Sequence, residues 1–215
     1  MAAFFGEDPM SRHLTVYFSL LSPWAYIGHG ELQGLAAKHE LRVDYRPVAL
    51  SQVFPESGGL PLSKRHPARQ RYRILELQRW REKRGLDFHL HPQFWPFDPA
   101  PADRIICAMV LAGADPQKFI AAAFAATFQR QRDLADPKVL VETLEETGYE
   151  PHWLQRGESG EAETSYQRNL ALALESGVFG SPSYVLDGEV FWGQDRLDLL
   201  DDALTSGRKP YQPDA

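Results

Sequence analysis

The stretch LTVYFSLLSPWAYIGHGELQGLAAKHELRVDYRPVAL, residues 14–50, decides the fold. Residues 14–20 alternate β-branched and aromatic side chains, which predicts a strand. Residues 26–40 carry apolar side chains at helical spacing, and residues 41–50 predict a second strand. A strand, a helix and a strand in so short a stretch form a βαβ unit, so we expect the two strands to lie parallel and side by side.

The pattern changes twice along the rest of the chain. Residues 51–62, SQVFPESGGLPL, are rich in Gly, Pro and Ser and predict a loop, whereas residues 67–175 are almost wholly of helical pattern. SPSYVLDG and EVFWG then predict a hairpin that turns at Asp187-Gly188, and DRLDLLDDALTSG predicts a closing helix. This layout predicts an α/β chain: a thioredoxin-like fold, residues 14–62 and 176–208, interrupted by an all-helical insertion domain, residues 63–175.

Composition limits the function classes. A formal net charge of −6 argues against nucleic acid as a main partner, and no apolar run is long enough to cross a membrane. We expect residues 1–13 to be a polar arm rather than a signal peptide, and the chain to be cytoplasmic. The single cysteine, Cys107, lies in an apolar helical stretch, which favours a buried, inert thiol and excludes dithiol chemistry.

Three junctions between strands and helices are candidate ligand sites, because a helix N-terminus offers free N–H groups and a positive dipole end. Ser22 precedes Pro23 at the first helix start; it is either a simple N-cap or a hydroxyl within reach of a ligand. Ser181-Pro182 is a candidate cis peptide, which would turn the Ser181 backbone toward a peptide-like ligand. Gly193 to Asp195 would hold a carboxylate and an ammonium group, unless Asp195 only caps the last helix.

The segments FSLLSPWAYIG, GVFGSPSYVL and VFWGQDRLDLLDDAL resemble those of 2-hydroxychromene-2-carboxylate isomerases and kappa-class glutathione transferases, in the DsbA-like thioredoxin superfamily. The resemblance covers about residues 14–204. It implies glutathione as cofactor and a homodimer. Ser22 would face the glutathione sulfur, Ser181 beside cis-Pro182 would hold the cysteinyl backbone, and the γ-glutamyl end would lie on Trp192, Gly193, Gln194 and Asp195.

The resemblance also implies a mechanism. Redox relatives carry two cysteines where this chain has Ser22 and Ala25, so disulfide exchange is excluded at this site. Ser22 would instead donate a hydrogen bond that favours the glutathione thiolate, aided by the helix dipole. The expected function is an isomerase that acts on an unsaturated aromatic carboxylate by reversible thiolate addition. The alternatives are a kappa-like transferase or peroxidase, and a non-catalytic binding protein of thioredoxin fold.

The substrate would bind between the sheet and the helical insertion. The candidate anchors are Ser63, Lys64, Arg65 and Phe94, although the basic residues could equally form a solvated rim with Arg69, Arg71 and Arg73, and Phe94 could be a core residue. The isomerases carry Asn-Arg where Ser63-Lys64 stands, so the resemblance implies glutathione more directly than their substrate. His89 and His91 alternate in a possible strand but have no apparent third partner, so we expect no metal site.

Overall fold

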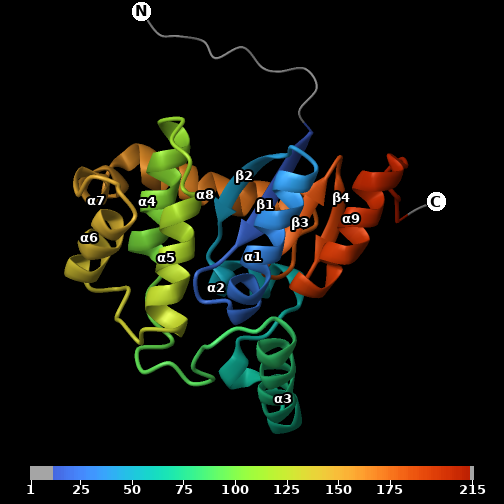
Figure 1. Cartoon of the computed structure of the whole chain (residues 1–215), viewed down its shortest axis with the longest axis horizontal. Coiled ribbons are helices and arrows are strands. Elements are labelled where there is room, and N and C mark those ends of the chain that lie inside the picture. The colour runs from blue at the N-terminus through green and yellow to red at the C-terminus, as the bar shows by residue number, and fades with distance from the viewer. Residues whose placement is uncertain (1–11, 214–215) are drawn as a thin grey trace, which may run out of the picture.

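The computed structural model of the chain describes residues 12–213, and its centre is a four-stranded mixed sheet (Figure 1). The strand order is β2-β1-β3-β4. β1 pairs with β2 in parallel, whereas β3 is antiparallel to both β1 and β4. The strands are β1 (His13–Phe18), β2 (Arg42–Pro47), β3 (Ser183–Leu186) and β4 (Glu189–Trp192). The predicted parallel pair and the predicted hairpin are both confirmed.

Helices cover both faces of the sheet. Val16 and Phe18 of β1 point into a large core with α1 (Pro23–Lys38) and α9 (Leu197–Ser206), whereas Tyr17 points to the opposite face. There it packs in a smaller cluster with residues of α2 (Leu50–Ser57) and α8 (Gly160–Glu175). The alternation of side chains along β1 therefore gives each face of the sheet its own apolar layer.

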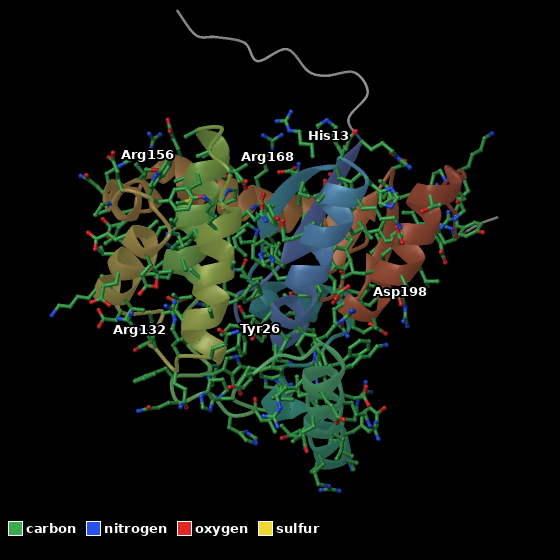
Figure 2. All side chains as sticks on the ribbon, viewed as in Figure 1. His13, Tyr26, Arg132, Arg156, Arg168 and Asp198 are labelled. Carbon is green, nitrogen blue, oxygen red and sulfur yellow. The ribbon has the colours of Figure 1, made fainter. Side chains whose placement is uncertain are left out.

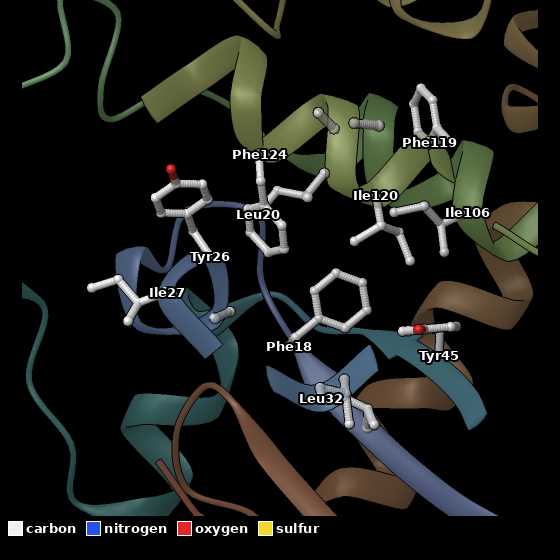
Figure 3. Close-up of a cluster of buried hydrophobic side chains, with 14 of the residues drawn as sticks. Phe18, Leu20, Tyr26, Ile27, Leu32, Tyr45, Ile106, Phe119, Ile120 and Phe124 are labelled. Atoms are coloured by element: carbon white, nitrogen blue, oxygen red, sulfur yellow. The ribbon is translucent and has the colours of Figure 1, made fainter. Parts of the chain in front are cut away.

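Most of the chain between β2 and β3 is helical. α4 and α5 lie beside the sheet, α6 and α7 lie beyond them, and α3 projects away from the sheet (Figure 1). Phe18 of the sheet packs with Phe124 of α5 in one continuous core, which also contains Ile106 of α4 (Figure 3). The bounds are η1 (Leu62–Lys64), α3 (Pro67–Lys83), α4 (Ala100–Leu111), α5 (Gln117–Phe128), α6 (Pro137–Glu146) and α7 (His152–Gly157). The thioredoxin-like fold with a helical insertion is confirmed, while its boundaries at residues 63 and 175 stay predictions.

The predicted loop at residues 51–62 is wrong over its first half, where α2 forms. Pro55 and Gly58 indicate a break, yet Val53 is fully buried against the α8 side of the sheet, and this packing stabilises the helix. Gly58 ends α2 in the left-handed conformation, at φ 74°, as a helix-stopping glycine does. The burial of Val53 therefore outweighs the helix-breaking tendency of the local composition.

Two further expectations concern the membrane and the first residues. Within residues 12–213, no helix is both long and apolar enough to cross a bilayer. The expected polar arm at residues 1–13 falls almost wholly outside the described residues, and His13 already belongs to β1.

Candidate functional site

Ser22 caps α1 and at the same time reaches across to the loop before β3. Its Oγ accepts a hydrogen bond from the Ala25 N–H at 3.2 Å and donates one to the Ser181 carbonyl oxygen at 3.0 Å. Ser22 itself is only 5% exposed. The N-cap interpretation is therefore confirmed. A hydroxyl has a single hydrogen, so a bond from Ser22 to any ligand requires it to turn away from the Ser181 carbonyl.

The loop before β3 is fixed against the end of β1. The Ser19 N–H donates to the Ser181 Oγ at 3.0 Å, and the Ser19 carbonyl accepts from the Ser22 N–H at 2.9 Å. The peptide bond between Ser181 and Pro182 is cis, as expected. Within residues 12–213, the Ser181 N–H has no hydrogen-bond acceptor. Ser19, Ser22 and Ser181 thus form one buried cluster at the carboxyl end of β1, with one backbone donor left over.

The segment after β4 joins this cluster through Pro182. The Pro182 carbonyl accepts from the Gly193 N–H at 2.9 Å. Gly193 has a φ of 102°, and a Cβ there would lie 2.4 Å from the Asp195 carboxylate, so glycine is required. A Cβ on Gly180 would lie 2.3 Å from the indole nitrogen of Trp192. These close approaches place residues 180–182 directly beside residues 192–195.

The side chains of Trp192, Gln194 and Asp195, in the predicted glutathione site, differ in exposure. Trp192 is 51% exposed and contacts the ring of Phe179 at 4.7 Å between centroids. Gln194 is buried against α1, where a Cβ on Gly28 would lie 2.6 Å from its Cβ, and its Oε1 is buried without a hydrogen-bond partner. Asp195 is partly exposed and pairs with Arg196 at 2.6 Å. Only Trp192 and Asp195 therefore present their side chains at the surface.

The interpretation of Asp195 as the cap of the last helix is wrong. Residues Gln194–Arg196 form a short 3₁₀ turn, η2, and α9 begins at Leu197 after Arg196, with no side chain bonded to its first N–H groups. The extra turn places Asp195 inside the 3₁₀ segment, so its carboxylate does not reach the first turn of α9.

A small cavity of about 10 Å³ lies beneath the cluster, between Ala25, His29 and Pro182. A cavity of that volume is just large enough for one water molecule. The His29 Nε2 is buried with no hydrogen-bond partner, and burial lowers the pKa of His29 to about 4. His29 is therefore neutral at pH 7.

Among the described residues, no hydrogen bond or ring contact joins the candidate substrate anchors to the serine cluster, but Trp95, the neighbour of Phe94, bonds beside it. The Trp95 Nε1 donates to the carbonyl of Leu21, next to Ser22, at 2.9 Å. The guanidinium of Arg73 lies 5.2 Å from the centre of the Trp95 ring. Burial, together with the nearby charge of Arg65, lowers the pKa of Arg73 to about 10. Arg73 and Trp95 therefore belong to the surroundings of the site.

Among the four predicted anchors, Arg65 is the most constrained. It donates to the Leu60 carbonyl at 2.7 Å and lies 5.7 Å from the ring centre of Phe54. Ser63 and Lys64 are exposed in η1, and Phe94 is 40% exposed, which makes it no core residue. In the part of the chain that the structure describes, no hydrogen bond or ring contact joins these four side chains to Ser22 or Ser181. Their role in binding stays a prediction.

The histidine pair and the cysteine can be placed directly. His89 and His91 lie in an irregular segment and not in one of the described strands, so the predicted strand there is wrong. The His89 N–H bonds to the Phe128 carbonyl. The described residues contain no group of three metal-binding side chains. Cys107 is buried, as predicted, and burial raises the pKa of its thiol to about 12.

The arrangement offers hydrogen-bond donors to a peptide-like or anionic ligand. The donors around it are the free Ser181 N–H, the N-terminus of α1, which has no acidic residue in its first turn, and the Ser22 hydroxyl once it turns. The sequence did not single out Ser19 or Phe179, because their contacts join separate segments of the chain, and it did not show the bond from Trp95 to the Leu21 carbonyl. Ser19 could have been noticed as a polar residue that ends a buried strand.

Comparison with known proteins identifies relatives of nearly the whole chain. The family model for the DsbA-like thioredoxin domain matches residues 13–205. A 2-hydroxychromene-2-carboxylate isomerase of Sphingobium xenophagum is 28% identical over 200 residues, which cover 91% of this chain and 99% of that protein. The enzyme of the same name from Pseudomonas putida is 28% identical over 194 residues, covering 87% and 92%. A solved structure of 2-hydroxychromene-2-carboxylate isomerase superposes with a TM-score of 0.75 at 25% identity, covering 90% and 95%.

Proposed function

Because the chain belongs to the family of DsbA-like thioredoxin domains, we propose that it is a glutathione-dependent isomerase of an unsaturated aromatic carboxylate resembling 2-hydroxychromene-2-carboxylate. The relatives named as isomerases of that compound support an isomerase. We also propose a homodimer, as the family resemblance implies, and a cytoplasmic location, as the sequence pattern of the first residues suggests. The observation that carries the proposal is the convergence of Ser22 and Ser181, residues far apart in sequence, on one buried hydrogen bond.

The proposed glutathione site would use backbone and side-chain groups that lie without a protein partner or at the surface. Ser181 would offer its free backbone N–H beside cis-Pro182 to the peptide, and Asp195 would take the ammonium group at the exposed end. The buried, unpartnered Oε1 of Gln194 is an acceptor that a bound ammonium or amide could satisfy. The set that would hold glutathione is Ser22, Ser181, Pro182, Trp192, Gly193, Gln194 and Asp195.

When bound, glutathione supplies a thiol that adds reversibly to an activated double bond. Ser22 would turn its hydrogen from the Ser181 carbonyl toward the sulfur, and its oxygen would continue to accept from the Ala25 N–H. The N-terminus of α1 favours negative charge at the same place. Both effects stabilise the thiolate over the thiol, which raises the population of the nucleophile at neutral pH.

The carboxylate of the substrate would meet a basic surface. Arg65 and Arg73 lie near one another, and Arg73 stacks on Trp95, which is bonded to the residue before Ser22. Two guanidinium groups held close together favour a carboxylate between them. Lys64 and Ser63 would add to this surface, and the exposed ring of Phe94 would contact the aromatic part of the substrate.

The decisive experiment incubates the purified chain with 2-hydroxychromene-2-carboxylate and follows its isomerisation by absorbance, with and without glutathione. Turnover that depends on glutathione and leaves the glutathione concentration unchanged supports the proposal. Accumulation of a conjugate would instead support a kappa-like transferase. If millimolar glutathione leaves the melting temperature unchanged, the non-catalytic binding protein is favoured, since a ligand that binds the folded state must stabilise it.

A further inference from the structure

A second cavity, distinct from the Ser22 cluster, opens between the edge strand β2 and the helices α4 and α8, with a volume of about 210 Å³. This is room for one small organic molecule. None of its lining residues belongs to the proposed glutathione site. Arg168, on its wall, and Tyr26, in the first turns of α1 near Ser22, lie toward opposite ends of the sheet in Figure 2.

The charges around this cavity do not balance. Arg46 is paired with Asp44, whose Oδ2 accepts from the Arg46 Nε at 2.7 Å, so this pair is neutral. Arg168 of α8 also lines the cavity; it is exposed, and within residues 12–213 its guanidinium has no hydrogen bond or ion pair. A net positive charge therefore remains on the cavity wall, and an anion is its complement.

Further polar groups accompany that charge. Ser165 lines the cavity one helical turn before Arg168, and its hydroxyl, which also bonds the Cys107 thiol, would turn to donate to a ligand. Asn169, 8% exposed, also lines it, and its Nδ2 donates to the Pro47 carbonyl at 3.2 Å, which fixes the side chain against the end of β2. The polar side of the cavity is thus assembled on one face of α8.

Part of the lining is apolar. Val110 of α4 and Leu172, which follows Arg168 by one turn on the same face of α8, contribute aliphatic side chains, and the Cys107 thiol stays protonated because burial raises its pKa to about 12. An apolar wall disfavours a fully hydrated inorganic ion and favours a ligand that carries a short hydrocarbon chain. The carboxylate of Asp44 on the rim further disfavours a dianion.

We propose that this cavity is a binding site for a small organic monocarboxylate, with the carboxylate on Arg168 and Ser165 and the hydrocarbon chain on Val110 and Leu172. The site does not depend on the proposed isomerase activity, and no residue is shared between the two. The cavity lies beside the edge strand β2, where Asn169 of α8 bonds to the Pro47 carbonyl. A ligand bound there would contact both the sheet and the helical insertion and would stabilise their packing.

The test titrates the full chain with butyrate, at constant ionic strength, and records the melting temperature and the heat of binding. Butyramide, which lacks the charge, and inorganic phosphate, which lacks the chain, are the comparison ligands. We expect saturable binding of butyrate, and at least tenfold weaker binding of the other two, because a hydrogen bond to a charged group contributes about that much.

Matched variants locate the site. Arg168→Gln should weaken butyrate binding about tenfold or more, whereas Arg71→Gln, the same change at an exposed arginine of α3, should leave it unchanged. Ser165→Leu fills the cavity from α8 and should abolish binding even if the Arg168 variant folds poorly. The proposal is overturned if butyrate causes no shift up to about 50 mM, if phosphate or butyramide binds as tightly, or if the Arg168 variant binds like wild type.

Discussion

Replacing Ser22 with alanine tests both roles of its hydroxyl at once. The variant loses the N-cap bond to the Ala25 N–H and leaves the buried Ser181 carbonyl without its donor. The lost cap costs about 1 kcal/mol of unfolding free energy, and the unpaired carbonyl about 1 kcal/mol more. The total, about 2 kcal/mol, corresponds to a melting temperature lower by about 4–8 °C in a chain of this size.

Ser159 provides a matched control for the stability measurement. It caps α8 in the same way, since its Oγ accepts from the Ala162 N–H at 3.2 Å and donates to the Arg156 carbonyl at 2.8 Å. The donated bond is exposed there, so water can replace it, and Ser159→Ala should cost only the cap, about 1 kcal/mol. Urea unfolding of both variants measures the difference, which isolates the buried bond between Ser22 and Ser181.

Turnover separates the proposed catalytic role of Ser22 from its structural role. If its hydroxyl stabilises the thiolate, Ser22→Ala should lower kcat by about ten- to a hundredfold and change glutathione affinity much less. Ser159→Ala should leave kcat unchanged, and Ser22→Thr, which keeps a hydroxyl, should retain part of it. Equal losses of kcat and affinity in the Ser22 variant would refute the activation role, and equal destabilisation by the two alanine variants would refute the buried bond.

Three other substitutions test neighbouring features. Gly193→Ala should lower the unfolding free energy by about 1–3 kcal/mol, because Gly193 has a φ of 102° and the new Cβ would meet the Asp195 carboxylate. Gly30→Ala, where the new Cβ would enter open space on α1, is the control and should not lower the unfolding free energy. Urea unfolding measures both variants. Trp95→Phe should cost about 1 kcal/mol in the same assay through the lost bond to the Leu21 carbonyl; no loss would mean that the bond is absent in solution. Burial raises the pKa of Asp103 well above its usual value, so the folded state holds that proton more tightly and wild-type stability falls as pH rises above the unfolded pKa. Asp103→Asn should therefore gain stability over wild type as pH rises from 3 to 7, and a difference independent of pH would contradict the assignment.

The strands, the parallel β1–β2 pair and the β3–β4 hairpin follow from local patterns in the sequence, whereas the pairing of β1 with β3 does not. Val16 and Phe18 alternate with Tyr17, and that alternation alone assigns them to opposite faces of the sheet. The turn at Asp187-Gly188 likewise predicts the β3–β4 hairpin. These signals are local, so tertiary packing only reinforces them. α2 is the contrary case, because the burial of Val53 is a long-range contact that the Gly- and Pro-rich composition conceals.

The site was only partly predictable for the same reason. Ser22 before Pro23 and Ser181 before Pro182 are visible as turn and cap chemistry within a few residues. The partner of the Ser22 hydroxyl is not visible, because it depends on how the loop before β3 docks on β1. The bond from Trp95 to the Leu21 carbonyl spans a long stretch of chain and has no local signature.

The N-cap and ligand interpretations of Ser22 need not exclude each other, because they use different parts of the hydroxyl. Capping of α1 uses an oxygen lone pair, which accepts from the Ala25 N–H, whereas the hydrogen is the part that bonds the Ser181 carbonyl. A thiolate beside Ser22 would compete only for that hydrogen, and a charge-assisted bond is roughly twice as strong as a neutral one. The exchange would therefore be favourable without loss of the cap. The Ser181 carbonyl, released from Ser22, would then be free to accept from the peptide N–H of the same ligand, so that binding the backbone and activating the sulfur would be coupled through one hydrogen bond.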